Sequence, residues 1–174
     1  WGWYYLSTIL DDYSRYIIHW ELCSNMKTED VTRSIDRALE KTGLSKEDRP
    51  RLLSDNGSCY ISSKLAEYID DQDMSHVRGN PNHPQTQGKI ERYHRSMKNI
   101  VKLENYYLPG DLINRLEEFV DYYNNHRYHE SLRNVTPADV YFGRDQKILQ
   151  QREITKLKTM KQRRKTHLSQ VLNL

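Results

Sequence analysis

Two acidic residues have the type and the sequence context of metal-binding carboxylates, and the first is Asp55. It follows the short apolar run RLLS and precedes Asn56-Gly57, which is a turn sequence. In α/β sheets, ligand sites gather beyond the carboxyl ends of the strands. An ordinary turn accounts for Asp-Asn-Gly as well, because Asp and Asn favour turns without any chemical role. On these residues alone, both interpretations of Asp55 remain open.

The second candidate is Glu91, near the start of a long helix that we expect from about Gln87 to Leu103. Arg95, Lys98 and Lys102 follow at +4, +7 and +11, so they share the helical face of Glu91. A carboxylate at the head of a row of cations favours a metal ligand beside groups that contact a phosphate backbone. The alternative is a plain Glu91–Arg95 ion pair, one helical turn apart.

Histidines are frequent in this chain, but their spacing does not match a zinc site. The two cysteines, Cys23 and Cys59, are far apart and lie away from the histidines, so we expect no Cys/His zinc centre. His83 and His94 flank Glu91 in sequence and are candidates for contacting phosphate or a water molecule. The histidines considered are His76, His83, His94, His126 and His129.

The elements that must position these residues follow a mixed α/β order. Residues 3–10 and 16–23 predict two strands of a hairpin, joined by DDYSR. Thr28 is the expected cap of a helix that ends at Gly43. A buried strand at Leu52 and Leu53, a helix over 62–72 capped by Ser62 or Ser63, and a short strand in MSHVRG follow. The Pro- and Gly-containing segment 79–88 predicts an irregular loop.

The remaining chain is expected to be helical and increasingly basic. Apolar residues from Leu112 to Tyr123 predict an amphipathic helix, and Thr136-Pro137 predicts the start of another. The net charge of +3 divides into +7 for residues 144–174 and −4 for residues 1–143. A basic arm on a mildly acidic body suggests a polyanion partner, although a solvated charged helix would have the same composition.

Long stretches of the sequence resemble a known family. The segments SDNGSCYIS around Asp55 and HPQTQGKIERYHRSMK around Glu91 closely resemble the integrase-type catalytic core of bacterial insertion-sequence transposases. The opening YYLSTILDDYSRYIIHW and the later YYNNHRYHESLRNVTPADVYFG resemble the same family. The resemblance implies an α/β, ribonuclease-H-like mixed sheet with flanking helices, the fold shared with retroviral integrases. Residues 1–143 would be a partial catalytic core, and residues 144–174 a basic C-terminal helical tail.

The resemblance also implies a site of two aspartates and a glutamate that holds two Mg²⁺ ions, for which Mn²⁺ may substitute. Asp55 matches the second aspartate and Glu91 the glutamate. The first aspartate belongs to a strand that precedes the hairpin, so we expect it upstream of residue 1 and expect the chain as given to be inactive. The hairpin aspartates Asp11 and Asp12 are not expected to replace it. They lie about seven residues along the strand from the active-site end, which is roughly 20 Å.

The function implied is DNA cleavage and strand transfer by two-metal phosphodiester chemistry. The partners would be transposon ends and target DNA, with assembly as a homo-oligomer. Arg95, Lys98 and Lys102 would hold the DNA backbone. Two other functions remain open: a catalytically dead remnant that binds DNA or other protomers, and a hydrolytic nuclease on the same fold. No membrane span is present in the sequence, and the cysteine usage suits a reducing, cytoplasmic setting. The resemblance implies a bacterial protein associated with the nucleoid.

Overall fold

A β-hairpin forms the centre of the protein. The computed structural model describes residues 3–79 and 88–171. Strands β1 (Tyr5–Leu10) and β2 (Ile17–Cys23) pair antiparallel, with Tyr5 opposite Cys23. Aromatic and β-branched residues favour the extended backbone of both strands. The hairpin confirms the expectation from the sequence.

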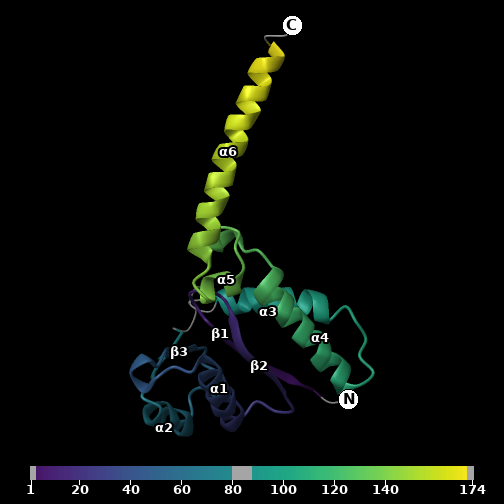
Figure 1. The fold of residues 1–174 in the computed structure, drawn as a ribbon. Helices are drawn as coiled ribbons and strands as arrows, with labels where there is room; N and C mark the ends of the chain where they lie inside the picture. The colour runs from purple at the N-terminus through teal and green to yellow at the C-terminus, as the bar shows by residue number, and fades with distance from the viewer. Residues whose placement is uncertain (1–2, 80–87, 172–174) are drawn as a thin grey trace.

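Helices cover the hairpin on two sides (Figure 1). On one face, Leu6 and Leu10 of β1 pack against the core formed with α3 (Gly88–Val101) and α4 (Pro109–Asp121). On the other face, Ile9 packs toward a second cluster formed with α1 (Thr28–Thr42). Successive strand residues alternate between faces, so one short hairpin can serve two cores.

Helix α1 differs from the prediction at its start and agrees with it at its end. Lys27, rather than Thr28, is the N-cap, and the Asp30 carboxylate accepts a hydrogen bond of 3.0 Å from the Lys27 backbone N–H. The hydroxyl of Thr28 instead lies 2.9 Å from that of Ser62. Gly43 ends the helix in the left-handed conformation, with φ of 62°, which glycine adopts without steric cost.

The remaining strands form a separate parallel pair. β3 (Arg51–Ser54) and β4 (Ser75–Arg78) are joined through α2 (Ser63–Asp71), which Ser62 caps as expected. The described strands therefore make two two-stranded sheets, as expected of a mixed sheet that lacks the strand between β1 and β3. The prediction that β3 is buried is wrong for Leu53, which is 38% exposed. A strand with a neighbour on only one side leaves its other side uncovered.

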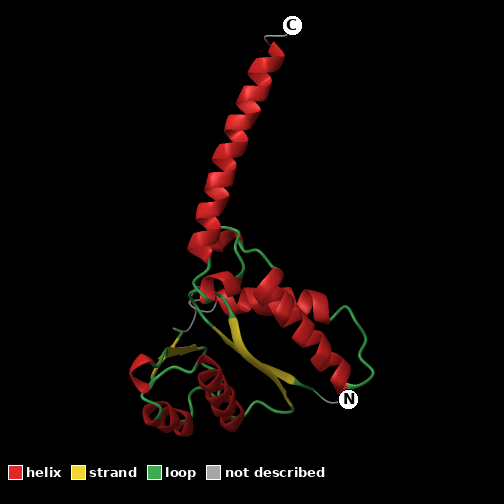
Figure 2. Ribbon diagram, viewed as in Figure 1, coloured by secondary structure: helices red, strands yellow, loops and turns green. Residues whose placement is uncertain are grey.

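The C-terminal third first packs beside the hairpin and then extends away from the rest of the molecule. A π-helical turn, η3 (Tyr122–His126), follows α4, and α5 (Pro137–Tyr141) begins after the capping residue Thr136, as predicted. Short 3₁₀ turns lie at Lys46–Asp48 and Glu130–Leu132. Helix α6 (Asp145–Val171) projects away from the rest of the molecule (Figure 2).

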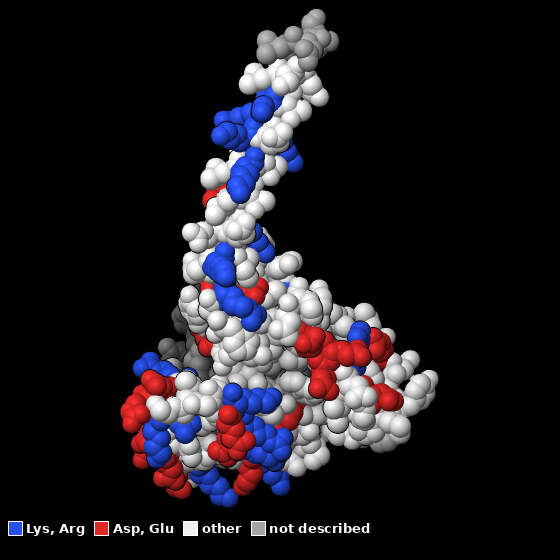
Figure 3. Space-filling view, in the orientation of Figure 1, with Lys and Arg blue, Asp and Glu red and all other residues white. Residues whose placement is uncertain are grey.

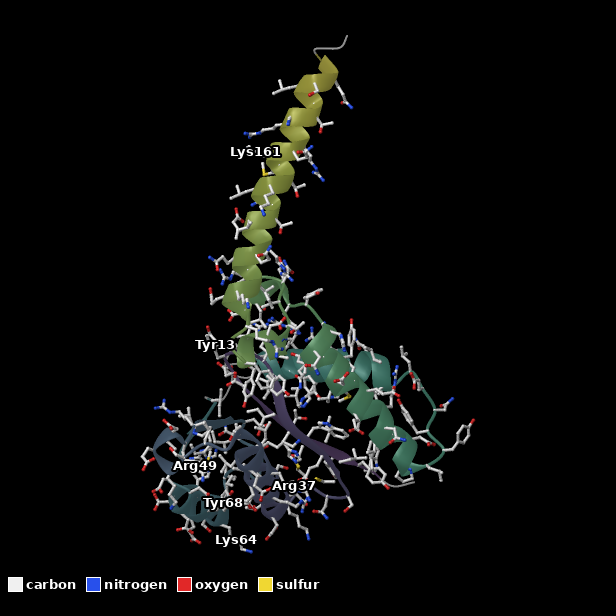
Figure 4. The ribbon with its side chains drawn as sticks, in the orientation of Figure 1. Tyr13, Arg37, Arg49, Lys64, Tyr68 and Lys161 are labelled. Carbon is white, nitrogen blue, oxygen red and sulfur yellow. The ribbon has the colours of Figure 1, made fainter. Side chains whose placement is uncertain are left out.

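Helix α6 is the longest of the described helices, and it is exposed from Gln150 to Gln170. Its side chains, Lys161 among them, project outward from the helix (Figure 4). Blue cations mark it in Figure 3, whereas red acids gather over the region of α4.

Among the described residues, no helix is long and apolar enough to cross a membrane. Most of the loop expected at 79–88 lies outside the described residues.

Candidate active site

Asp55 and Glu91 line the same cavity, of about 610 Å³. Asp55 directly follows β3, and Glu91 lies in the first turn of α3. The cavity lies between β1 and β3, and both strands contribute much of its wall, including Leu6 and Leu52. The two carboxylates predicted from the sequence are therefore brought to one cavity, although 35 residues separate them in the chain.

The position of Asp55 is fixed by the turn that follows it. Its Oδ1 accepts a hydrogen bond of 2.8 Å from the backbone N–H of Gly57. A Cβ at Gly57 would lie only 3.0 Å from that oxygen, so a larger residue would disturb the turn. The side chain of Asn56 donates to the Gly79 carbonyl at 2.8 Å, which ties the turn to the end of β4. The turn interpretation of Asp55 is thus correct, since its own carboxylate accepts the turn hydrogen bond, and the residue stays exposed.

Glu91 is exposed and forms no ion pair with any residue in the described part of the chain. The Glu91–Arg95 pair considered from the sequence is therefore not formed in this structure. Lys89, two residues earlier, pairs instead with Asp12 at 2.6 Å. Sequence reasoning missed Lys89, because no local pattern links it to a residue 77 positions away.

Asp11 and Asp12 line the cavity as well, but both carboxylates already have partners. Asp11 accepts hydrogen bonds from Ser14, at 2.7 Å from the backbone N–H and 2.5 Å from the hydroxyl. Asp12 is the partner of Lys89. The contacts of Asp11 lie within the hairpin turn, as expected, whereas Asp12 pairs with α3 at a position two residues from Glu91. Within residues 3–79 and 88–171, no three His, Cys, Asp or Glu side chains cluster closely enough to hold a metal ion.

The predicted DNA-contacting cations are exposed along and just beyond α3. Arg95 and Lys98 lie on the helix, and Lys102 is the first residue after it. None of the three pairs with an acid among the residues described. Cations without acidic partners remain available for an external anion.

Two of the histidines considered from the sequence lie near this site. His94 lines the cavity, and its burial lowers its pKa, with Lys98 adding to the effect. Its ring is therefore neutral at physiological pH. His76 contacts the hydroxyl of Ser54 at 2.8 Å, which makes it a structural residue of the β3–β4 pair. His83 lies outside the described residues.

The site lies within a region that matches known protein families. Two models, each described as an integrase core domain, match residues 1–84 and 72–137. Together the two matches span residues 1–137, so most of the chain is similar to integrase core domains. Integrase core domains are DDE-type phosphoryltransferases.

Viral proteins dominate the similar sequences. The chain is 29% identical over 100 residues to a putative integrase, ORF3, of Spiroplasma virus SpV1-C74, covering 50% of this chain and 28% of that protein. It is 45% identical over 58 residues to an IgE-binding protein of Mus musculus, covering 32% of this chain and 10% of that protein. It is 26% identical over 113 residues to the Gag-Pro-Pol polyprotein of mouse mammary tumor virus, covering 63% of this chain and 6% of that protein. The chain thus spans only a minor part of these relatives.

Solved integrase structures share the fold. The catalytic core domain of BIV integrase superposes with a TM-score of 0.60 at 19% identity, covering 83% of this chain and 89% of that one. The core domain of HTLV-2 integrase in complex with magnesium superposes with a TM-score of 0.58 at 18% identity, covering 77% of this chain and 81% of that one. A chain of the simian T-cell lymphotropic virus intasome superposes with a TM-score of 0.67 at 19% identity, covering 79% of this chain and 48% of that one. The α/β integrase core fold with flanking helices is therefore confirmed.

Proposed function

We propose that this integrase core domain cleaves DNA and transfers strands in transposition, as part of a bacterial insertion-sequence transposase. The observation that carries the proposal is that Asp55 and Glu91 line one cavity. Both carboxylates are exposed at the end of a strand and the start of a helix. Sites at such strand ends are common in α/β folds.

Magnesium fits the donor chemistry of these two residues. Mg²⁺ prefers carboxylate oxygens and binds through one or two carboxylates together with substrate phosphates. Neither Asp55 nor Glu91 is neutralised by an ion pair among the described residues. When two ions are bound in such a site, they activate the attacking hydroxyl and stabilise the leaving oxygen. Asp55 and Glu91 would act as ligands and not as nucleophiles, so no covalent intermediate with the protein is expected.

A third carboxylate would complete the site, and the cavity offers a position for it. β1 and β3 border the cavity, and each is paired on only one side among the described strands. Strands in a sheet lie about 4.8 Å apart, so an extended segment can pair with two neighbours at once. We propose that a strand inserted between β1 and β3 supplies this carboxylate beside Asp55. It would also cover Leu53, which is 38% exposed.

DNA would bind along the face of α3 that begins with Glu91. Arg95, Lys98 and Lys102 would contact backbone phosphates and thereby position the strand without reading its sequence. The basic charge of α6 would add affinity that decreases with salt. Assembly of several protomers on DNA is part of the proposal, by analogy with the intasome of simian T-cell lymphotropic virus.

A second function is favoured by one observation. The described residues contain no cluster of three potential metal ligands. A chain with only two such carboxylates would bind DNA or other protomers without cutting. A hydrolytic nuclease would cut DNA but would not join the ends.

The test compares the chain as given with a version extended by a native-frame N-terminal segment that supplies the strand. Each is assayed for end cleavage and strand transfer with Mg²⁺ or Mn²⁺. The extended protein is expected to perform both steps. Asp55→Asn and Glu91→Gln should abolish both, whereas the matched variants Asp70→Asn and Glu67→Gln, at exposed positions of α2, should remain active.

The outcomes separate the three functions. Cleavage without joining would identify a nuclease, and DNA binding without either step would identify a remnant. Full activity of the Asp55→Asn or Glu91→Gln variant would overturn the assignment of the site.

A further inference from the structure

The Lys89–Asp12 ion pair joins the hairpin turn to the start of the helix that carries Glu91. The ammonium of Lys89 donates to the carboxylate of Asp12 at 2.6 Å and to the backbone carbonyl of Asp12 at 2.8 Å. Lys89 is the second residue of α3, and Glu91 follows two positions later. All three residues line the cavity that Asp55 also lines. The pair is therefore a direct link between the hairpin and the candidate active site.

The hairpin turn is held firmly by its own hydrogen bonds. Ser14 is buried, and its backbone N–H and its hydroxyl both donate to the carboxylate of Asp11. The N–H of Asp11 donates to the Tyr16 carbonyl at 2.9 Å, and the N–H of Arg15 donates to the Asp11 carbonyl at 2.7 Å. None of these bonds uses the side chain of Asp12, whose carboxylate contacts only the lysine of α3 in the described part of the chain.

Aromatic packing fixes the same turn against α5. The ring of Tyr16 stacks on that of Tyr141, with ring centres 4.5 Å apart, and meets Phe142 edge-on at 5.6 Å. In Figure 4, Tyr13 of this turn lies at the end of the body from which α6 extends. Tyr141 itself lines the cavity. The turn and α5 therefore form a preorganised support beside the site, which is what precise placement of functional groups requires.

The start of α3 depends on such a support more than its middle does. Tyr93 and Met97 are buried in the core, whereas Glu91 is exposed. The N–H groups of a first helical turn have no partner within the helix. Within residues 3–79 and 88–171, the bond from Lys89 to Asp12 is the only ion pair that α3 makes.

We propose that Asp12 and Lys89 are positioning residues, which hold the first turn of α3 and thereby keep Glu91 in place beside Asp55. The inference rests on the proposed function for the reaction itself. Metal-binding groups must be held to within about 0.5 Å, and a misplacement of about 1 Å can lower a rate about a hundredfold. The side chains of Lys89 and Asp12 are 39% and 65% exposed, so the pair contributes little to stability and acts through geometry.

The first test needs no reaction and uses the chain as given. Hydrogen exchange followed by mass spectrometry reports on the backbone amides of residues 92–95, whose helical hydrogen bonds run to the carbonyls of residues 88–91. Lys89→Met and Asp12→Ala should each speed this exchange about twofold to fivefold, the range that loss of an exposed ion pair allows. Exchange at the wild-type rate in both variants would overturn the inference.

Lys64→Met is the matched control because it also breaks an exposed ion pair. Lys64 pairs with Glu29 at 3.4 Å, and neither residue lines the cavity. Figure 4 shows Lys64 at the opposite end of the body from Tyr13. This variant should leave both the exchange in α3 and the reaction unchanged. The melting temperature of every variant should stay within about 2–4 °C of the wild type, which shows that each is folded.

The second test measures single-turnover cleavage and DNA affinity separately in the strand-extended protein. At saturating DNA, Lys89→Met and Asp12→Ala should each lower the cleavage rate about tenfold or more. The double variant should be no slower than either single variant, because both substitutions remove the same contact. Lys89→Arg keeps the charge and the donors, so it should restore most of the rate. Asp12→Ala should not weaken DNA binding, because it removes a negative charge.

Binding of Mn²⁺ to the same protein, followed by electron paramagnetic resonance, gives a readout besides the reaction. Both single variants should bind Mn²⁺ more weakly than the wild type and the Lys64→Met control. A slow Lys89→Met variant beside a fully active Asp12→Ala variant would overturn the inference, because Lys89 would then act on DNA directly. Unchanged cleavage and unchanged Mn²⁺ binding in both variants would overturn it as well.

Failure of the proposed function gives a different pattern. Cleavage would then persist in Asp55→Asn and Glu91→Gln, whereas hydrogen exchange in α3 would still depend on Lys89 and Asp12. If only the inference fails, Asp55→Asn and Glu91→Gln are inactive while Lys89→Met and Asp12→Ala cleave at the wild-type rate. The two ideas can therefore be judged from the same set of variants.

Discussion

Helices α3 and α6 are both long and carry exposed cations, but only α3 is built into the core. Tyr93 and Met97 of α3 are 1% and 8% exposed and pack against α4 and the hairpin. In α6, Leu157 and Leu168 are 59% and 61% exposed. The helix is fixed mainly near its start, where Arg152 donates to the Asn134 carbonyl at 2.7 Å and lies over the Tyr128 ring. A packed helix can hold a carboxylate at a defined position, whereas a free helix can contribute only charge.

The largest expected effect concerns stability, and one methionine in each helix tests it. Met97→Ala removes a buried side chain, so the free energy of unfolding should fall by about 2–5 kcal/mol. Met160→Ala removes a side chain that is 45% exposed, and we expect a change within about 0.5 kcal/mol. Urea denaturation of both variants measures the difference. Equal losses would mean that α6 packs against something in solution and is not a free arm.

Removing most of α6 should weaken DNA binding without unfolding the body. Deletion of residues 153–174 keeps the interactions of Arg152 and removes six Lys and Arg residues together with Glu153. The slope of log K against log salt should flatten by about 0.9 for each DNA phosphate that the shortened protein no longer neutralises. Titration of labelled DNA at several salt concentrations measures it. An unchanged slope would mean that α6 is a solvated or protein-binding helix.

A smaller and more selective effect distinguishes the cations of the two helices. The triple variant Arg95→Gln/Lys98→Gln/Lys102→Gln should lower both DNA affinity and the cleavage rate at saturating DNA, because these residues flank Glu91. A matched variant on α6, Lys158→Gln/Lys161→Gln/Lys165→Gln, should lower affinity alone. Single-turnover cleavage by the extended protein separates the two parameters. A reduced rate in the α6 variant would show that α6 also positions DNA for the reaction.

The last prediction concerns pH. His129 has its pKa lowered to about 4, chiefly by burial, whereas an unfolded histidine titrates near 6.5. Between these values the unfolded state binds more protons, so the protein should lose stability as the pH falls from about 6.5 to 4. His129→Gln should reduce this pH dependence, and His167→Gln on exposed α6 serves as the control. Denaturation midpoints measured between pH 4 and 6.5 would show the reduced pH dependence of stability. The same pH dependence of the midpoint in His129→Gln and His167→Gln would contradict the argument.

The local elements were predictable because short-range patterns determine them. The hairpin, the Ser62 and Thr136 caps and the Gly43 stop each depend on a few adjacent residues. Lys27 and not Thr28 is the N-cap of α1, and the hydroxyl of Thr28 instead contacts that of Ser62, 34 positions away in the sequence. The exposure of Leu53 could not be predicted from its apolar neighbours, because burial depends on which strand lies beside β3.

The candidate site was only partly predictable for the same reason. Asp55 and Glu91 were found from their sequence context and the family resemblance, and they line one cavity. The Lys89–Asp12 pair joins segments that are far apart in sequence. No local pattern signals such long-range pairs, so they become visible only in the folded chain.

The most direct test of the account is the position of a bound metal ion in the strand-extended protein. Crystals grown with Mn²⁺, which gives an anomalous X-ray signal, would locate the ion independently of any assumed ligands. The account predicts an ion about 2.1 Å from a carboxylate oxygen of Asp55 and of Glu91. Two ions, if both are bound, should lie about 3.5–4 Å apart. An ion bound elsewhere, with the carboxylates of Asp55 and Glu91 more than about 10 Å apart, would contradict it, since two ions at that spacing could not span them.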